Sequence, residues 1–298
     1  MKKLSLLSIL TLFLCVHLNA QQTPQYTQFM TNPFLINPAI AGTFNYYQIV
    51  SNNRFQWVGL TDSPVTNVLS IFGPMVNQPM GLGGYVIYDV TGPTSRASLN
   101  GSYAYYYTIN EELKISMGIS LGVMQYKIDG TKITTEYPDS KLEDKIYNEI
   151  VPDATVGLFF YSSNYQIGFA ATQLINNKLK LGDNPTGLSK LNSHFYLTAG
   201  YKYYINREFA VEPTLILKKV APAPLQLDFN TRVFYRNMVW GGFSYRTKDA
   251  VSVLVGYIYQ NKIYISYSYD IGITPIRKFN SGSHELTIGF KFSPIKDY

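Results

Sequence analysis

The sequence predicts an all-β fold: a single antiparallel transmembrane β-barrel of about fourteen strands, with an N-terminal segment that closes it as a hatch or plug. Three observations support this prediction. The chain begins with an export signal and has no later apolar run of the roughly 18 residues that a membrane-spanning helix needs. Its side chains alternate with a period of two, and the lengths of its connections alternate as well.

Residues 1–20 are expected to form a secretory signal peptide that is removed on export. Lys2 and Lys3 precede an apolar run from Leu4 to Val16, and Leu18-Asn19-Ala20 is an acceptable cleavage site. The single cysteine, Cys15, lies inside that run, so we expect a mature chain without disulfides or thiol chemistry. Removing two lysines takes the formal charge from +6 to +4, which gives no reason to expect nucleic acid as a partner.

The expected mature chain divides into residues 21–45, a hatch or periplasmic segment, and residues 46–298, the outer-membrane barrel. It is unusually aromatic, with 26 Tyr and 17 Phe in the whole sequence against 15% charged residues. Such a composition suits a surface that meets something other than water, which leaves a soluble all-β protein as the less favoured alternative to a barrel.

The side-chain period distinguishes these two classes. In residues 113–124, LKISMGISLGVM, aliphatic side chains occupy one parity, and Lys, Ser and Gly occupy the other. The same alternation runs through residues 194–204, 251–260 and 285–292. Segments of roughly ten residues with one apolar face are what a tilted strand needs to cross a bilayer. The fourteen predicted strands are 46–57, 65–73, 82–90, 95–108, 113–126, 152–162, 164–172, 193–205, 207–218, 225–236, 238–246, 250–259, 261–270 and 283–292.

Connection lengths follow strand parity. Links after even-numbered strands are very short, for example at Asn206 and Gln260, although 74–81 is longer than expected. Short turns at one end and long loops at the other are typical of outer-membrane barrels, and an even strand count brings both chain ends to the same side. All the long links follow odd-numbered strands: 127–151, 173–192 and 271–284.

The segment before the first strand is more apolar than a solvated tail should be. Pro33 and Pro38 exclude a regular helix or central strand there. Because the wall side chains of a fourteen-stranded barrel do not fill its lumen, we expect this segment to fold into the barrel mouth as a hatch. The alternative is an ordered periplasmic collar outside the lumen. The apolar residues that need burial are Phe29, Met30, Phe34, Leu35, Ile36 and Ile40.

Alternation in the first predicted strand places Arg54 and Gln56 in the lumen and Phe55 and Trp57 at the membrane interface, which aromatic rings prefer. Two roles are open for Arg54. It either pairs with an interior carboxylate such as Asp89 or Glu212 and stiffens the barrel, or it contacts a bound chain.

Residues 25–42 contain two Asn-Pro pairs, the second followed by Ala, and then a Gly; residues 54–57 are RFQW. This arrangement resembles the opening signature of the PorP/SprF family, outer-membrane proteins associated with type IX secretion and gliding motility. Residues 168–174, GFAATQL, resemble the family's mid-barrel segment. The matching N-terminal positions are Gln25, Gln28, Asn32, Pro33, Asn37, Pro38, Ala39, Gly42, Arg54, Gln56 and Trp57.

The resemblance implies a cell outer membrane protein of a Gram-negative bacterium that supports the export or surface display of a large secreted adhesin. It implies that the adhesin's C-terminal domain and other type IX secretion or gliding components are partners. Asn37-Pro38-Ala39 also resembles a motif in the N-terminal hatch of FadL-type transporters. The alternative function is therefore a FadL-like channel for small or hydrophobic solutes.

No catalytic, cofactor-binding or metal-binding pattern stands out. His194 and His284 are the histidines of the mature chain, and the serine beside each would point to the opposite face of its strand. The acidic loop 139–149 has four acids, but its lysines favour a solvated loop over a calcium site. Glycines at 81, 83, 84, 118 and 122 lie in predicted strands, where small luminal residues are expected rather than phosphate-binding turns. We predict a non-enzymatic protein that needs no cofactor.

Overall fold

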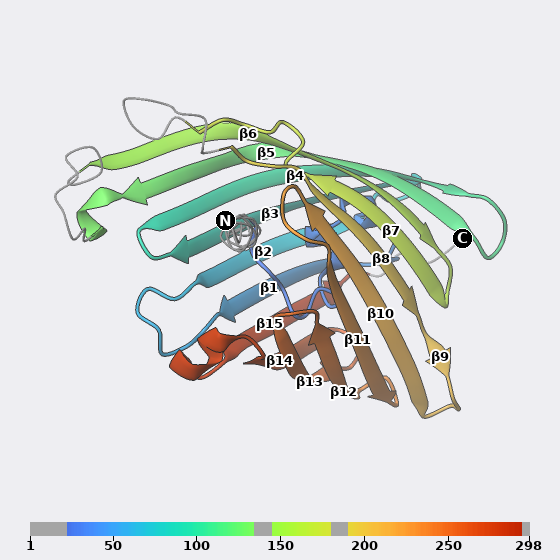
Figure 1. The fold of residues 1–298 in the computed structure, drawn as a ribbon. Helices are drawn as coiled ribbons and strands as arrows, with labels where there is room; N and C mark the ends of the chain where they lie inside the picture. The colour runs from blue at the N-terminus through green and yellow to red at the C-terminus, as the bar shows by residue number, and fades with distance from the viewer. Residues whose placement is uncertain (1–22, 134–144, 180–189, 294–298) are drawn as a thin grey trace, which may run out of the picture.

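The computed structural model describes residues 23–133, 145–179 and 190–293. Figure 1 shows one large, strongly twisted antiparallel sheet that closes on itself. No helix in the described ranges is long and apolar enough to cross a membrane. The short 3-10 helices are η1 (Pro33–Leu35), η2 (Pro38–Ile40), η3 (Gly130–Lys132) and η4 (Pro275–Phe279). The strands are β1 (Tyr47–Phe55), β2 (Val65–Pro74), β3 (Met80–Thr91), β4 (Thr94–Thr108), β5 (Lys114–Asp129), β6 (Ile146–Tyr161), β7 (Tyr165–Thr172), β8 (His194–Tyr201), β9 (Tyr203–Tyr204), β10 (Phe209–Val220), β11 (Gln226–Tyr235), β12 (Val239–Arg246), β13 (Ala250–Tyr259), β14 (Ile263–Gly272) and β15 (Ser283–Phe292).

Fourteen of these fifteen strands form the closed ring. The ring closes where β15 pairs antiparallel with β1, with Tyr47 opposite Phe292 and Phe55 opposite His284. The remaining strand, β9, continues β8 along β10 after an interruption at Lys202 and is not a separate member of the ring. The prediction of a fourteen-stranded antiparallel barrel is confirmed.

The two faces of the strands differ as the sequence period predicts. In β5, Met117 and Leu121 are 50% and 58% exposed on the outer face, whereas Ser116 and Ser120 on the inner face are buried. The first strand alternates in the same way, with Val50 buried inside the ring. An apolar belt outside and small polar side chains inside are the distribution that a bilayer-spanning barrel requires.

The two ends of the barrel differ in their connections. We call the end with short connections the turn end and the opposite end the loop end. β1 begins and β15 ends at the turn end, where Tyr47 lies opposite Phe292. The turn-end connections are 75–79, 109–113, 162–164, 205–208, 236–238 and 260–262. The loop-end connections are 56–64, 92–93, 130–145, 173–193, 221–225, 247–249 and 273–282. The predicted asymmetry is therefore present.

The strand boundaries differ most from the prediction around the longest hairpin. Both ends of the predicted loop 127–151 are strand, because β5 continues to Asp129 and β6 begins at Ile146. One face of this part of β6 is exposed, whereas Tyr147 and Glu149 on the other face are half-buried and Val151 is buried. Polar residues such as Asn148 and Glu149 interrupt the apolar alternation here, so the period of two does not stand out in the sequence. The acidic segment 139–149 lies mostly outside the described residues.

The N-terminal segment, residues 23–46, lies inside the ring and supplies much of its apolar core; it is the dark blue chain of Figure 1. Phe34 is 1% exposed and stacks on Phe72 of β2, with ring centroids 4.4 Å apart. Ala39 and Ile40 of η2 are also buried in this cluster. A cluster formed between the segment and the inner wall explains why the segment is more apolar than a free tail.

Strand glycines make room for this segment. A Cβ atom built on Gly81 would overlap the backbone of Gly42, and one built on Gly118 would overlap the backbone of Ala39. A Cβ on Gly101, in contrast, meets nothing within 4 Å. Gly81 and Gly118 are thus the small luminal residues that the sequence predicts, and the segment lies directly against them.

A valine at position 118 is expected to destabilise the protein because it must displace η2 or the wall. Gly118→Val should lower the free energy of unfolding by roughly 1–3 kcal/mol, the usual cost of overpacking. Heat-dependent unfolding of the purified barrel, followed by its mobility shift in SDS gels, measures this. Gly101→Val in the neighbouring strand is the matched control and should unfold like the unmodified protein. Equal behaviour of the two variants would show that the segment does not press on the wall.

Candidate functional site

The candidate site is the interior of the ring, where the N-terminal segment meets the inward-facing side chains of the wall. Its most polar part lies towards the loop end and centres on Arg54 of β1. Arg54 is 2% exposed and forms ion pairs with Asp270 (Nη2 to Oδ2, 2.7 Å) and Glu285 (Nη1 to Oε2, 3.1 Å). The backbone N–H groups of Thr27 and Gln28 donate to the two carboxylate oxygens of Glu285, at 2.8 and 3.1 Å. One buried acid therefore links the wall cation to the segment.

A second group of charges adjoins the first. Arg246 of β12 donates to Asp228 through Nε at 3.1 Å and to Asp249 through Nη1 at 3.1 Å. Lys218 of β10 pairs with Asp228 at 2.7 Å. The Thr27 hydroxyl accepts from both Arg54 and Arg246, at 3.1 Å each, and so connects the two groups. We call the two groups together the loop-end charge cluster.

The partners expected for Arg54 were wrong. Glu212 pairs instead with Arg232, Nη2 to Oε1, at 2.7 Å. Asp89 accepts from the Thr66 hydroxyl at 2.6 Å. Sequence analysis did not single out Asp270, Glu285 or Arg246, although an isolated charge on the small-polar parity of a strand is a signal that could have pointed to them.

The first Asn-Pro pair fastens the middle of the segment to the wall. The Asn32 amide donates to Asn52 Oδ1 at 2.7 Å and to Ser70 Oγ at 2.9 Å. Pro33 opens η1, where the missing N–H of proline leaves no unsatisfied donor. The asparagine therefore supplies the wall contact, and the proline sets the turn that follows.

The second pair works in the same way nearer the turn end. Asn37 caps η2 by accepting from the N–H of Ala39 at 3.0 Å, and its amide donates to the carbonyl oxygens of Leu158 and Phe169, at 2.9 and 3.3 Å. Pro38 is the first residue of η2. The Ala39 carbonyl in turn accepts from the Ser116 hydroxyl at 2.6 Å. Each of these motif residues thus has a structural task in holding the segment.

The other residues predicted to lie in the first strand, Phe55, Gln56 and Trp57, do not belong to the loop-end charge cluster. β1 ends at Phe55, which is 46% exposed on the outer face. Gln56 and Trp57 follow in the connection to β2: Gln56 donates its N–H to the Pro64 carbonyl, and Trp57 has a φ of 52°. The parity argument therefore does not extend to these two residues, because they are not part of the strand.

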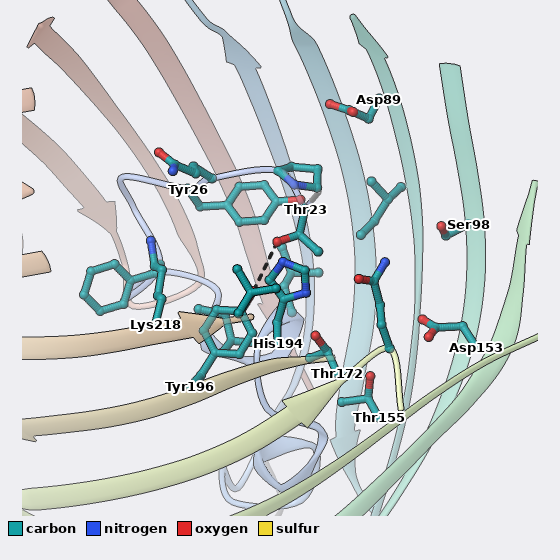
Figure 2. Close-up of a pocket in the computed structure, with 18 of the residues that line it drawn as sticks. Thr23, Tyr26, Asp89, Ser98, Asp153, Thr155, Thr172, His194, Tyr196 and Lys218 are labelled. Atoms are coloured by element: carbon teal, nitrogen blue, oxygen red, sulfur yellow. Dashed lines mark hydrogen bonds between the residues drawn. The ribbon is translucent and has the colours of Figure 1, made fainter. Parts of the chain in front are cut away.

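A cavity of about 130 Å³ with a mainly apolar lining lies between the segment and the wall towards the loop end. Figure 2 shows Tyr26, His194 and Tyr196 facing it, with Thr23 Oγ1 and Tyr196 Oη 3.3 Å apart. Among the described residues, Tyr26 Oη and His194 Nε2 are buried atoms without a hydrogen-bond partner. We call this space the loop-end cavity.

His194 and His284 are not brought together. His194 is buried inside the ring, and its Nδ1 lies 2.9 Å from the Asn192 carbonyl oxygen. His284 contacts the Tyr267 hydroxyl, and neither histidine adjoins a group of carboxylates. Among the described residues there is no group of three or more metal-binding side chains.

Comparison with solved structures finds similar barrels. They include the Acinetobacter baumannii outer membrane protein Omp33, with 11% identity and a TM-score of 0.50 over 83% of this chain and 99% of that chain. The CymD monoaromatic hydrocarbon channel has 11% identity and a TM-score of 0.50 over 92% and 94%. A Pseudomonas aeruginosa FadL homologue has 9% identity and a TM-score of 0.42 over 83% and 88%. At these identities the first two support the fold alone.

No curated protein matches the sequence. The family model described as "Type IX secretion system membrane protein PorP/SprF" matches residues 18–290, almost the whole chain. This match confirms the resemblance seen in the N-terminal motif and, with the closed barrel, makes the protein an integral outer-membrane protein. The chain belongs to the PorP/SprF family of type IX secretion system membrane proteins.

Proposed function

We propose that this protein acts as a partner and anchor in type IX secretion. In this proposal it binds the C-terminal domain of a secreted adhesin at the loop end and supports the adhesin's export or surface display. The N-terminal segment serves as a hatch that keeps the lumen closed while the partner is held outside. The signal peptide is removed on export, the turn end faces the periplasm, and the loop end faces the exterior, as loop lengths indicate for outer-membrane barrels.

The hatch role is supported by how firmly the segment is held. Thr27, Gln28, Asn32 and Ala39 are each at most 2% exposed, and all four bond to wall residues. These contacts run from the loop-end charge cluster to the turn end of the ring. A segment held along this path fits a hatch better than the alternative of a collar outside the lumen.

Adhesin binding at the loop end is supported by exposed apolar side chains beyond the ring. Phe279 of η4 is 70% exposed, and Ile146 and Ile150 on the projecting part of β6 are 57% and 66% exposed. Exposed apolar side chains on these two loop-end elements are candidates for contacts with a partner protein, because covering them removes apolar surface from water. These exposed side chains, together with family membership, carry the proposal.

Charge reversal at Arg54 is expected to loosen the hatch. Arg54→Glu would leave Asp270 and Glu285 buried without their cation, and breaking a buried pair in this way costs about 3–5 kcal/mol. We expect a less stable barrel that conducts ions in planar bilayers, whereas the unmodified protein conducts little. Thermal unfolding and single-channel recording measure the two effects.

Arg236→Glu is the matched control. Arg236 pairs with Glu208 at the turn end, where the side chains are 57% and 46% exposed, so solvent screens the pair and its reversal should leave the stability nearly unchanged. An Arg54→Glu barrel as stable and as non-conducting as this control would refute the hatch. Stepwise conductance of the unmodified protein would favour the alternative function, a FadL-like channel for small or hydrophobic solutes.

A charge in the exposed loop-end surface is expected to weaken adhesin binding. Phe279→Asp should reduce the amount of adhesin C-terminal domain that co-purifies with the barrel by about tenfold, the effect of losing roughly 1.4 kcal/mol. Quantitative mass spectrometry of barrels purified from outer membranes in mild detergent gives this ratio. Val76→Asp is the control, because Val76 is 58% exposed at the opposite, turn end. Full adhesin recovery with Phe279→Asp and loss with Val76→Asp would show that the adhesin binds at the turn end, which contradicts the proposal.

A further inference from the structure

A second hollow lies at the turn end, on the other side of the N-terminal segment from the loop-end cavity. Its volume is about 710 Å³, within the range of roughly 300–1,000 Å³ typical of ligand pockets. It opens at the turn end, because Asn237, Gln260 and Asn261 of the short connections line it. We call it the turn-end vestibule.

The charged side chains of this vestibule are mainly cations. Lys202, Arg232, Arg236 and Lys291 line it, against the single acid Glu212. Glu212 is engaged by Arg232 at 2.7 Å, and Arg236 pairs with Glu208 outside the lining. The two lysines carry the excess positive charge of the vestibule.

Both lysines rest on aromatic rings. Lys202 Nζ lies 4.7 Å from the ring centroid of Phe234 and 3.2 Å from Asn237 Oδ1. Lys291 Nζ lies 4.8 Å from the ring centroid of Tyr46. Each ammonium group also lies over a second ring, that of Tyr204 for Lys202 at 5.3 Å and that of Tyr264 for Lys291 at 5.8 Å. In the part of the chain that the structure describes, neither lysine forms an ion pair with a carboxylate. Rings orient a cation without removing its charge, so both lysines remain able to pair with an anion.

Aromatic and amide groups complete the lining. The rings of Phe44, Trp240 and Tyr264 can pack against apolar side chains. The side-chain amides of Gln48, Gln166, Asn237, Gln260 and Asn261 offer both donors and acceptors. A peptide presents N–H and C=O groups in alternation, which is the pattern that such amides satisfy.

The floor of the vestibule is the N-terminal segment itself. Met30, Thr31 and Pro33 line it, and the Tyr264 hydroxyl donates to the Thr31 carbonyl at 3.3 Å. An occupant of the vestibule would therefore touch the segment directly, one residue away from Asn32 and its two wall contacts.

We propose that the turn-end vestibule is a binding site for an acidic peptide segment with aromatic side chains, provided by a protein that approaches from the turn end. The acids pair with Lys202 and Lys291, the aromatic side chains pack on the rings, and the amides bind the backbone. If the turn end faces the periplasm, as in the proposed function on which this inference rests, the partner is a periplasmic protein that contacts the hatch from the periplasmic side.

A short fluorescein-labelled peptide that alternates glutamate with tyrosine serves as the probe, with the detergent-purified full-length barrel as receptor. Fluorescence anisotropy should show binding that weakens as salt is added, because exposed charge pairs are screened. The same peptide with glutamine in place of glutamate should bind at least about tenfold more weakly, since it lacks the negative charges that pair with the two lysines.

The double variant Lys202→Glu/Lys291→Glu should lose about tenfold or more in affinity for the acidic peptide. Lys248→Glu/Lys278→Glu is the matched control: it makes the same change in net charge at the loop end and should keep the affinity of the unmodified protein. Hydrogen exchange gives an independent location for the site. Bound peptide should slow exchange at the amides of Met30 and Thr31 in the floor of the vestibule.

The proposal is overturned if the acidic peptide does not bind, or if the two double variants bind it equally well. It is also overturned if a heparin fragment or an oligonucleotide of equal charge displaces the peptide as readily as unlabelled peptide does, because the site would then recognise any polyanion. The assay contains no adhesin, so its result is independent of the loop-end test. Loss of the adhesin interaction alone would leave this site standing.

Discussion

Hydrocarbon offers no hydrogen-bond partner to a peptide group, and this constraint determines the wall of the molecule. Every strand must pair on both sides, so the sheet has to close, and it does so between β15 and β1. Closure gives each strand one face towards lipid and one towards the interior. Leu121 and Ser120, neighbours in β5, are 58% and 1% exposed for this reason. The same constraint explains why apolar and small polar residues alternate with a period of two in the sequence.

A ring of fourteen strands encloses more space than its own side chains fill, and the N-terminal segment occupies much of that space. It is held in two physically different ways. Near the loop end it is bound by charges, because Glu285 joins Arg54 to the backbone of Thr27 and Gln28. Near the turn end it is bound by close packing, because Gly118 permits the approach of Ala39.

The wall and the family could be predicted from the sequence, but the interior contacts only in part. Alternation fixes which side chains of a strand share a face, and so it placed Arg54 inside the ring. It does not fix which distant strand lies across from that face. Asp270 and Glu285 are more than 200 positions away, and their pairing depends on the closure of the ring. Local signals also failed where a strand ended early, at Gln56 and Trp57, and where polar residues interrupt the alternation at the loop ends of β5 and β6.

The segment around Thr27 and Gln28 is part of the folded interior, and the rest of the lumen's architecture depends on its position there. Hydrogen exchange of the mature barrel in lipid nanodiscs tests it most directly. The amides of Thr27 and Gln28 donate to Glu285, so they should exchange as slowly as amides in the middle of β1. Exchange of these two amides as fast as that of an unfolded peptide, in a barrel whose strands stay protected, would contradict the account.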